Sequence, residues 1–277
     1  MPDTVKEIGN SVIQFGKHND RVYIIKAHDS DMPALLTQVD SLANTGDYSK
    51  IFAKVPMQLK ETFENKGFTE EAAIPGFYNG QRDVYFMSKF RKQERGIVTN
   101  KPNLDEVLKI AEKKKNEPST KTLPELFSLK RLKAKDSEQI ANIYHRVFES
   151  YPFPIHDPEY IRKTMDENFI YYGIFSGKEL AAVSSAEMDE KGSNAEMTDF
   201  ATKPFFRGRS LANHLLGLME KDMQERGIKM LYTIARAISA GMNITFARAG
   251  YEFAGTLVNN TNISGSIESM NVWYKKL

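Results

Sequence analysis

The segment DFATKPFFRGRSLANHLLGLMEKDMQERG, residues 199–227, joins two kinds of secondary structure. Its first residues continue a strand-like run, and apolar residues recur at helical spacing from Leu211 to Arg226. Between them lies a loop with two arginines and a glycine, Arg207–Ser210. The N-terminus of a helix attracts anions, glycine allows a ligand to come close, and arginine pairs with phosphate. The junction therefore predicts a pyrophosphate-binding loop; the alternative is a surface loop with solvated arginines.

The composition of the whole chain limits the classes of protein that need to be considered. It has 277 residues, 41% of them hydrophobic, which suits one large domain or two smaller ones. The 38 basic and 36 acidic residues give a net charge of +2, so no overall field favours nucleic acid or a membrane. The absence of cysteine excludes thiol catalysis. No apolar run is long enough for a signal peptide or a membrane helix, so we expect a cytoplasmic protein.

A polar segment at 91–125 divides the chain near its middle. It contains a helical run, Leu104 to Lys115, which is followed by Pro118 and Pro124. Such a segment is typical of a linker with one helix. The predicted parts are an N-terminal domain at 1–92, a linker at 93–127 and a C-terminal domain at 128–277.

The two halves share a strand–helix–strand pattern. The predicted strands are 50–56 and 83–90 in the first half, and 230–236 and 269–276 in the second. In each half the helix ends at a glycine followed by an aromatic residue, Gly67-Phe68 and Gly250-Tyr251, which is typical of a left-handed helix C-cap. The shared pattern favours a duplication over a chance match. The first half has no counterpart of the 207–212 loop.

The second half resembles the GCN5-related N-acetyltransferase (GNAT) superfamily. Its periodicity predicts a helix within 135–153 and three strands within 168–202, before the loop, the long helix and the final strands. PFFRGRSLANHLL resembles the acetyl-CoA signature Gln/Arg-x-x-Gly-x-Gly/Ala, with Arg207 first and Ala212 last. Ser210 replaces the middle glycine, which costs about 1–2 kcal/mol if its φ is positive. The resemblance implies an α+β GNAT acyltransferase fold, a mixed central sheet flanked by helices, after a smaller degenerate GNAT-like α/β domain.

Longer segments resemble the β-lysine N-acetyltransferases within this superfamily. They are EMTDFAT, TIARAISAGMNITFARAGY and GTLVNNTNISGSIESMNVWYKK in the second half, and KIFAKVP and IPGFYNGQRDVYFMSKF in the first. This resemblance implies transfer of an acetyl group from acetyl-CoA to the N6 amine of β-lysine (3,6-diaminohexanoate), which gives a zwitterionic compatible solute. The implied partner is a small-molecule diamino acid, with neither nucleic acid nor a membrane. The oligomeric state stays open, and a homodimer is compatible with the sequence.

The resemblance also implies the residues that contact acetyl-CoA. The tyrosine that often protonates the leaving thiolate is replaced by Phe246, and Tyr232 or Tyr251 are alternatives, although each is expected in the core. The frequent CoA-contacting asparagine is replaced by Ser239, with Asn243 one turn later as its substitute. The implied cofactor-binding residues are Phe200, Ala201, Thr202, Arg207, Gly208, Arg209, Ser210, Leu211, Ala212, Ser239, Asn243 and Phe246.

The reaction needs a base, because an amine with a pKa of about 10.4 costs about 4.6 kcal/mol to deprotonate at pH 7. Glu196, on the strand before the loop, is the first candidate. Asp199 is the rival. The odd spacing of the two residues predicts that they point to opposite faces of the sheet, so only one of them can face the cleft.

The acceptor carries a carboxylate and a second amine. Arg236, at the end of the predicted strand 230–236, is the candidate partner of the carboxylate, and the 258–264 segment offers the amides of Asn259, Asn260 and Asn262. We expect 151–158 to close over the substrate, and the first half either to buttress the second half or to line the acceptor site through 74–80. The 5 histidines show no ligand spacing, so no metal is expected. The alternatives are another small amine, a protein lysine, or a non-catalytic acetyl-CoA-binding scaffold.

Overall fold

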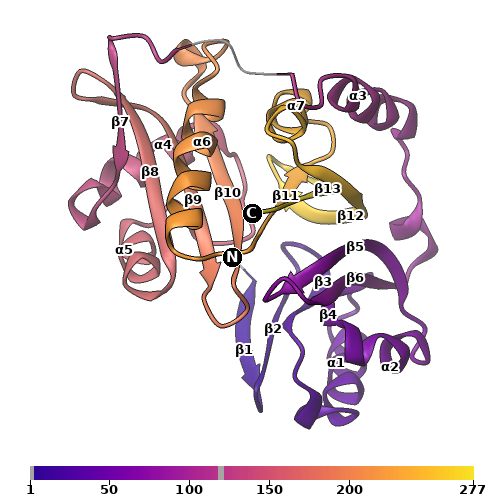
Figure 1. The fold of residues 1–277 in the computed structure, drawn as a ribbon. Coiled ribbons are helices and arrows are strands. Elements are labelled where there is room, and N and C mark those ends of the chain that lie inside the picture. Colours follow the sequence, from indigo (N-terminus) through magenta and orange to yellow (C-terminus); the bar gives the residue numbers. More distant parts are fainter. Residues whose placement is uncertain (1–2, 118–121) are drawn as a thin grey trace.

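The computed structural model describes residues 3–117 and 122–277, which form both strands and α-helices (Figure 1). Pro118 of the predicted linker lies outside the described residues. The strands are β1 (Thr4–Ile8), β2 (Ser11–Gly16), β3 (Arg21–Lys26), β4 (Lys50–Pro56), β5 (Thr69–Tyr78), β6 (Arg82–Phe90), β7 (Phe127–Arg131), β8 (Phe169–Ser176), β9 (Glu179–Asp189), β10 (Asn194–Thr202), β11 (Met230–Arg236), β12 (Glu252–Ile263) and β13 (Ser266–Lys276). The α-helices are α1 (Ala34–Thr45), α2 (Lys60–Glu64), α3 (Lys101–Lys113), α4 (Ser137–Val147), α5 (Pro158–Glu167), α6 (Leu211–Glu225) and α7 (Ala240–Arg248).

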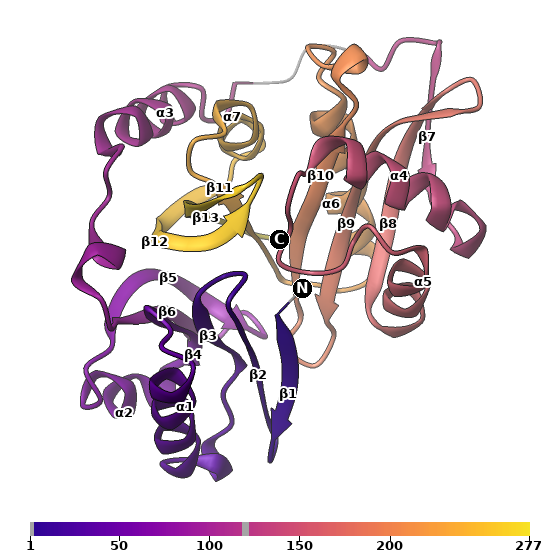
Figure 2. The same ribbon diagram turned by 180° about the vertical axis from the view of Figure 1, so that it is seen from behind.

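The strands form one mixed sheet in which the two halves of the chain repeat the same topology. Its order is β1-β2-β3-β4-β6-β5-β12-β13-β11-β10-β9-β8-β7. In the first half β3 is parallel to β4, and β4 is antiparallel to β6; in the second half β10 is parallel to β11, and β11 is antiparallel to β13. The halves meet where Ala72 of β5 pairs with Gly255 of β12 (Figures 1 and 2). The repeated pattern in the sequence therefore corresponds to a repeated strand order.

Helices cover both faces of the second half but only one face of the first. On one face of the second half, α6 and α7 pack through residues such as Met219 and Phe246, and α4 and α5 cover the other face. In the first half α1 and α2 cover one face. The other face carries Phe52 and Phe86, which share a core with Tyr232 of β11. The first half thus packs onto the second through a sheet face that no helix of the described residues 3–92 covers.

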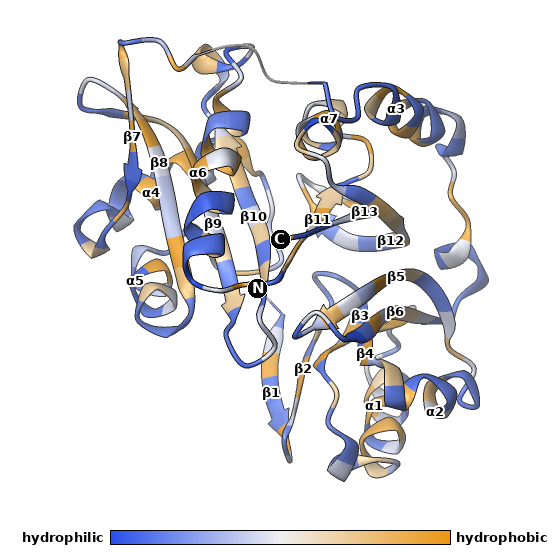
Figure 3. Cartoon of the chain, viewed as in Figure 1, coloured by the Kyte–Doolittle hydropathy of each residue, from blue (hydrophilic) through white to orange (hydrophobic). Residues whose placement is uncertain are grey.

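The helix of the predicted linker packs against the second half. α3 contacts α7, and Ala111 of α3 is fully buried in the core that α6 and α7 form. Hydrophilic residues cover most of the remaining surface of α3 (Figure 3). Gly67 and Gly250 have φ values of 80° and 84°, which confirms the predicted left-handed C-caps. Within the described ranges no helix is long and apolar enough to cross a membrane.

Candidate active site

A cleft opens where β10 and β11 separate. The two strands pair only from Asn194–Glu196 to Met230–Tyr232, and both continue beyond this point without pairing (Figure 1). A pocket of about 1210 Å³ occupies this region. It extends from the 207–213 loop, past the carboxyl half of β10, to β3 and β4 of the first half. A single pocket therefore joins the predicted anion-binding loop to a wall built by the N-terminal part of the chain.

The loop before α6 has the features of an anion site. All six residues of 207–212 line the pocket, and Gly208 has a φ of 76°. The backbone N–H groups of Gly208, Arg209 and Ser210 donate to no acceptor among the described residues. They lie at the N-terminus of a 15-residue helix, where the helix dipole favours an anion. Donors of this kind, with two adjacent guanidinium groups, fit a pyrophosphate.

Ser210 adopts the left-handed conformation that a glycine would take at no cost. Its φ is 59°, and its side chain makes no capping hydrogen bond to α6. Because the φ of Ser210 is positive, serine destabilises the loop by about 1–2 kcal/mol relative to glycine at this position. The loop keeps this geometry although the residue does not favour it.

The other predicted CoA contacts divide between the pocket and the core. Phe200, Thr202 and Ser239 line the pocket, whereas Ala201 is buried against the opposite core. Phe246 also lines the pocket, and its ring packs edge-on against Phe200 with 5.6 Å between the centroids. It has no proton to donate to a thiolate.

Asn243 is a structural residue, and its predicted contact with CoA is wrong. Its side chain is fully buried and does not line the pocket. The amide nitrogen donates to the carbonyls of Arg236 and Ser239 at 3.0 and 2.9 Å, and the amide oxygen accepts from Asn271 and Trp273. Every hydrogen-bonding position is used to fix α7 against β11 and β13.

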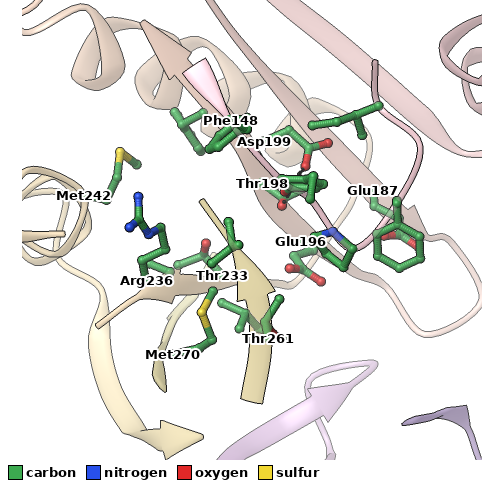
Figure 4. Close-up of a pocket in the computed structure, with 18 of the residues that line it drawn as sticks. Phe148, Glu187, Glu196, Thr198, Asp199, Thr233, Arg236, Met242, Thr261 and Met270 are labelled. Atoms are coloured by element: carbon green, nitrogen blue, oxygen red, sulfur yellow. Dashed lines mark hydrogen bonds between the residues drawn. The ribbon is translucent and has the colours of Figure 1, made fainter. Parts of the chain in front are cut away.

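Three carboxylates, Glu187, Glu196 and Asp199, enter the pocket from β9 and β10 (Figure 4). The prediction that Glu196 and Asp199 face opposite sides is wrong, because a β-bulge interrupts the alternation. The register with β9 shifts between Thr198 and Ala201, and Asp199 has a φ of 53°. A bulge inserts one extra residue and reorients the side chains that follow it. Both candidate bases therefore reach the same pocket.

The environment of Glu196 raises the pKa of its carboxyl to about 8. Burial is the main cause, and the neighbouring charge of Glu187 adds to it. The positive charge of Lys54 and a hydrogen bond from the Tyr232 hydroxyl act in the opposite direction. An ordinary glutamate is a much weaker base than this carboxylate.

Asp199 is more firmly held than Glu196. One carboxylate oxygen accepts a hydrogen bond from Tyr151, and the other accepts one from Ser185 at 2.5 Å. Burial raises the pKa of Asp199, and these hydrogen bonds oppose the rise. Tyr151 is the first residue of 151–158, the segment that we expected to close over the substrate.

No group of three or more potential ligands within residues 3–117 and 122–277 is arranged to hold a metal ion.

Only two of the four predicted substrate residues line the pocket. Arg236 lines the pocket, but its guanidinium pairs with both oxygens of Glu268, at 2.6 and 2.8 Å. Asn260 lines the pocket, with its side-chain oxygen buried and unpartnered. Asn259 and Asn262 do not line it: their amides donate to the carbonyls of Arg95 and Ile97 and of His18, respectively.

The first half lines the pocket through residues other than those predicted. None of 74–80 reaches it, and Phe77 instead packs edge-on against Tyr232, with 5.0 Å between the ring centroids. The residues of β3 and β4 that line it are Arg21, Tyr23, Ile25, Phe52 and Lys54. Arg21 and Lys54 are charged residues in largely apolar strands, but Lys26 and Lys50 are too, so the signal in the sequence was weak.

Of the tyrosines considered as proton donors, only one reaches the pocket. Tyr232 lines it, whereas Tyr251 is fully buried beside Phe246, with 5.0 Å between the ring centroids. Tyr251 is therefore a core residue, as we expected from the sequence.

Comparison with known proteins finds a family model that matches the second half and relatives that match most or all of the chain. The model of the acetyltransferase (GNAT) family matches residues 137–251. A β-lysine N(6)-acetyltransferase of Methanococcus maripaludis is 44% identical over 273 residues, which are 99% of this chain and 98% of that protein. A β-lysine N(6)-acetyltransferase of Methanosarcina mazei is 34% identical over 86% of this chain and 94% of its own length. The N-acetyltransferase YodP of Bacillus subtilis is 28% identical over the full length of both.

Proposed function

Because the chain belongs to the β-lysine N6-acetyltransferase family within the GNAT acetyltransferases, we propose that it acetylates the N6 amine of β-lysine with acetyl-CoA. The observation that carries this proposal is the pocket in which the 207–212 loop and three carboxylates meet. The loop suits the pyrophosphate of CoA, and the carboxylates suit an acceptor with two ammonium groups. The product, N6-acetyl-β-lysine, is a neutral zwitterion, which suits a compatible solute in the cytoplasm.

The raised pKa of Glu196 suits it to the role of general base. Transfer of a proton from an amine with a pKa of about 10.4 to an ordinary glutamate is uphill by about 8 kcal/mol. With the pKa of Glu196 at about 8, the same transfer is uphill by about 3 kcal/mol. Glu196 has one hydrogen bond from a tyrosine, whereas both oxygens of Asp199 are already bonded. We therefore assign proton removal to Glu196.

The remaining carboxylates position the acceptor. Glu187 and Asp199 lie beside Glu196 and can hold the second ammonium group of the diamine. Phe246 offers no proton, so the thiolate leaves unprotonated or takes a proton from another donor. Acetyl-CoA supplies the acetyl group, and the loop at 207–212 holds its phosphates.

The first half limits the acceptor to a small molecule. β3 and β4 form the end of the pocket that lies away from the loop, and among the described residues 3–92 no counterpart of the 207–212 loop lines it. A lysine on a folded protein would have to enter between the two halves. We propose that the first half shapes the acceptor site and does not bind CoA.

A panel of amines assayed with acetyl-CoA tests this function. We expect the full chain to acetylate β-lysine faster than a polyamine, a lysine-containing peptide or α-lysine, at equal concentrations. Preference for the peptide or the polyamine would assign the enzyme to another acceptor. Binding of acetyl-CoA without turnover of any amine would instead identify a scaffold.

A further inference from the structure

Three cations are buried in the first half, and one of them has no acidic partner. Lys50 pairs with Glu71 at 2.9 Å, and Arg95 lies 3.6 Å from Asp20. Arg21, at 3% exposure, forms no ion pair with a carboxylate of the described residues. A buried charge is retained when it is paired, so a cation without a partner indicates a missing anion.

The hydrogen bonds of Arg21 leave much of its guanidinium free. Nη1 donates to the carbonyl of Asn260 at 2.5 Å and to the hydroxyl of Thr261 at 3.2 Å. Nε is buried and has no partner among the residues that the structure describes. Asp3 is the acidic residue whose charge reaches Arg21, but its oxygens accept hydrogen bonds from Asn19 and the backbone of His18. Burial, with the nearby charge of Arg95, lowers the pKa of Arg21 to about 10.

The free side of Arg21 belongs to the acceptor end of the pocket. Arg21 lines the pocket, and its guanidinium carbon lies 5.1 Å from the centre of the Tyr23 ring. The charges of Arg21 and Glu196 both act on the Tyr23 hydroxyl, so both charged groups lie within electrostatic range of this residue. Thr261 accepts a hydrogen bond from Arg21, and the close-up shows Thr261 below Glu196 (Figure 4).

The repeated topology explains why β3 faces this pocket. Tyr23 pairs with Phe52 across β3 and β4, and Glu196 pairs with Tyr232 across β10 and β11. Because the parallel pair has the same place in both halves, Tyr23 occupies in the first half the position that Glu196 holds in the second. The strand that would carry a base in the first half instead forms a wall of the acceptor site.

The other cations around the pocket, Lys163 and Arg248 included, either have opposing charges or belong to the loop end. Arg236 is neutralised by two hydrogen bonds to Glu268. Lys54 lies within the field of Glu187 and Glu196 and lowers the pKa of both. Arg207 and Arg209 belong to the loop at the opposite end. Arg21 is therefore the cation best placed to receive an anionic group of the acceptor.

We propose that Arg21 binds the carboxylate of the diamino acid acceptor and determines its specificity, a role that the sequence assigned to Arg236. This inference rests on the proposed function, because it requires an acceptor with a carboxylate at one end and the reacting amine at the other. An acceptor without the carboxylate would leave the guanidinium buried and unpaired. The site should therefore discriminate strongly against such an acceptor.

The test compares β-lysine with its carboxamide, 3,6-diaminohexanamide, in the wild-type chain and in Arg21→Gln. Titration calorimetry in the presence of CoA measures binding, and initial rates with acetyl-CoA measure kcat/KM. We expect the wild type to bind the acid about 30-fold or more tightly than the amide, the effect of a charge-assisted hydrogen bond. In Arg21→Gln this preference should fall to about threefold or less, with the amide bound as before.

Arg236→Gln is the matched control, and it should keep the preference for the acid. If Arg236→Gln loses the preference and Arg21→Gln retains it, Arg236 is the partner and the inference is wrong. A wild type that acetylates β-lysine but binds acid and amide equally also overturns it, without any need for a variant to fold. A wild type that acetylates neither compound removes the proposed function and this inference together.

Discussion

Replacement of Glu196 by glutamine removes the proposed base and keeps the shape of the side chain. General-base catalysis contributes about 10²- to 10⁴-fold. With its pKa at about 8, roughly one tenth of Glu196 is ionised in the free wild type at pH 7. We therefore expect kcat/KM of the wild type to rise with pH up to about 8 and then to level off. In Glu196→Gln the rate should be about 100-fold lower at pH 8 and should rise toward the pKa of the amine, near 10.4.

The same substitution should stabilise the fold at neutral pH. The carboxyl of Glu196 ionises at about 8 in the folded chain, compared with a model value of 4.5, because burial disfavours its charge. Between these values the unfolded chain has released the proton that the folded chain retains, so the contribution of this group to stability falls as pH rises. The loss is about 3 kcal/mol at pH 7. A glutamine does not titrate and escapes this loss.

Two measurements on one variant therefore check the assignment. Urea unfolding of both proteins at pH 4.5 and pH 7 should give equal stabilities at the lower pH and a more stable Glu196→Gln at the higher one. Calorimetry should give an unchanged affinity for acetyl-CoA. An unaltered pH–rate profile in a folded Glu196→Gln would refute the reasoning, and the same profile change in Asp199→Asn would transfer the role to Asp199.

Three further changes test the loop and the carboxylate cluster. Arg207→Glu should weaken acetyl-CoA binding about 30-fold or more by calorimetry, because it places a negative charge at a phosphate site, whereas Lys221→Glu near the far end of α6 should not. Ser210→Gly should raise the free energy of unfolding by about 1 kcal/mol, because it relieves the positive φ; a loss of stability would show that the hydroxyl makes an unrecognised contact. Tyr151→Phe removes a donor to Asp199 and should raise KM for the amine about tenfold with little change in kcat; an effect on kcat alone would make Tyr151 a proton donor.

Local patterns in the sequence were enough to predict much of the fold. The strands at 50–56 and 230–236 have the predicted bounds, because continuous apolar runs between turns are unambiguous. The glycine C-caps and the strand–loop–helix junction at 207–212 also depend on short-range rules. The strands β1–β3 were not predicted, although they hold the places of β8–β10, because the repeat was recognised only from the strand at 50–56 onward.

The geometry of the site depends on contacts that no local pattern contains. Asp199 enters the pocket because a bulge changes the alternation of β10, and alternation alone predicts the opposite. Arg236 has the expected position, but its pairing with Glu268 depends on the register of β11 against β13. Arg21 is far from the second half in sequence, so its place in the acceptor site follows only from the packing of the two halves.

The site of acetylation in the product tests the central claim most directly. The full chain is incubated with acetyl-CoA and β-lysine, and the product is identified by mass spectrometry and NMR. We predict a single monoacetylated product with the acetyl group on N6, and a kcat/KM at least about tenfold higher than that for 1,5-diaminopentane. Acetylation of the N3 amine, or equal rates with the diamine, would contradict the account.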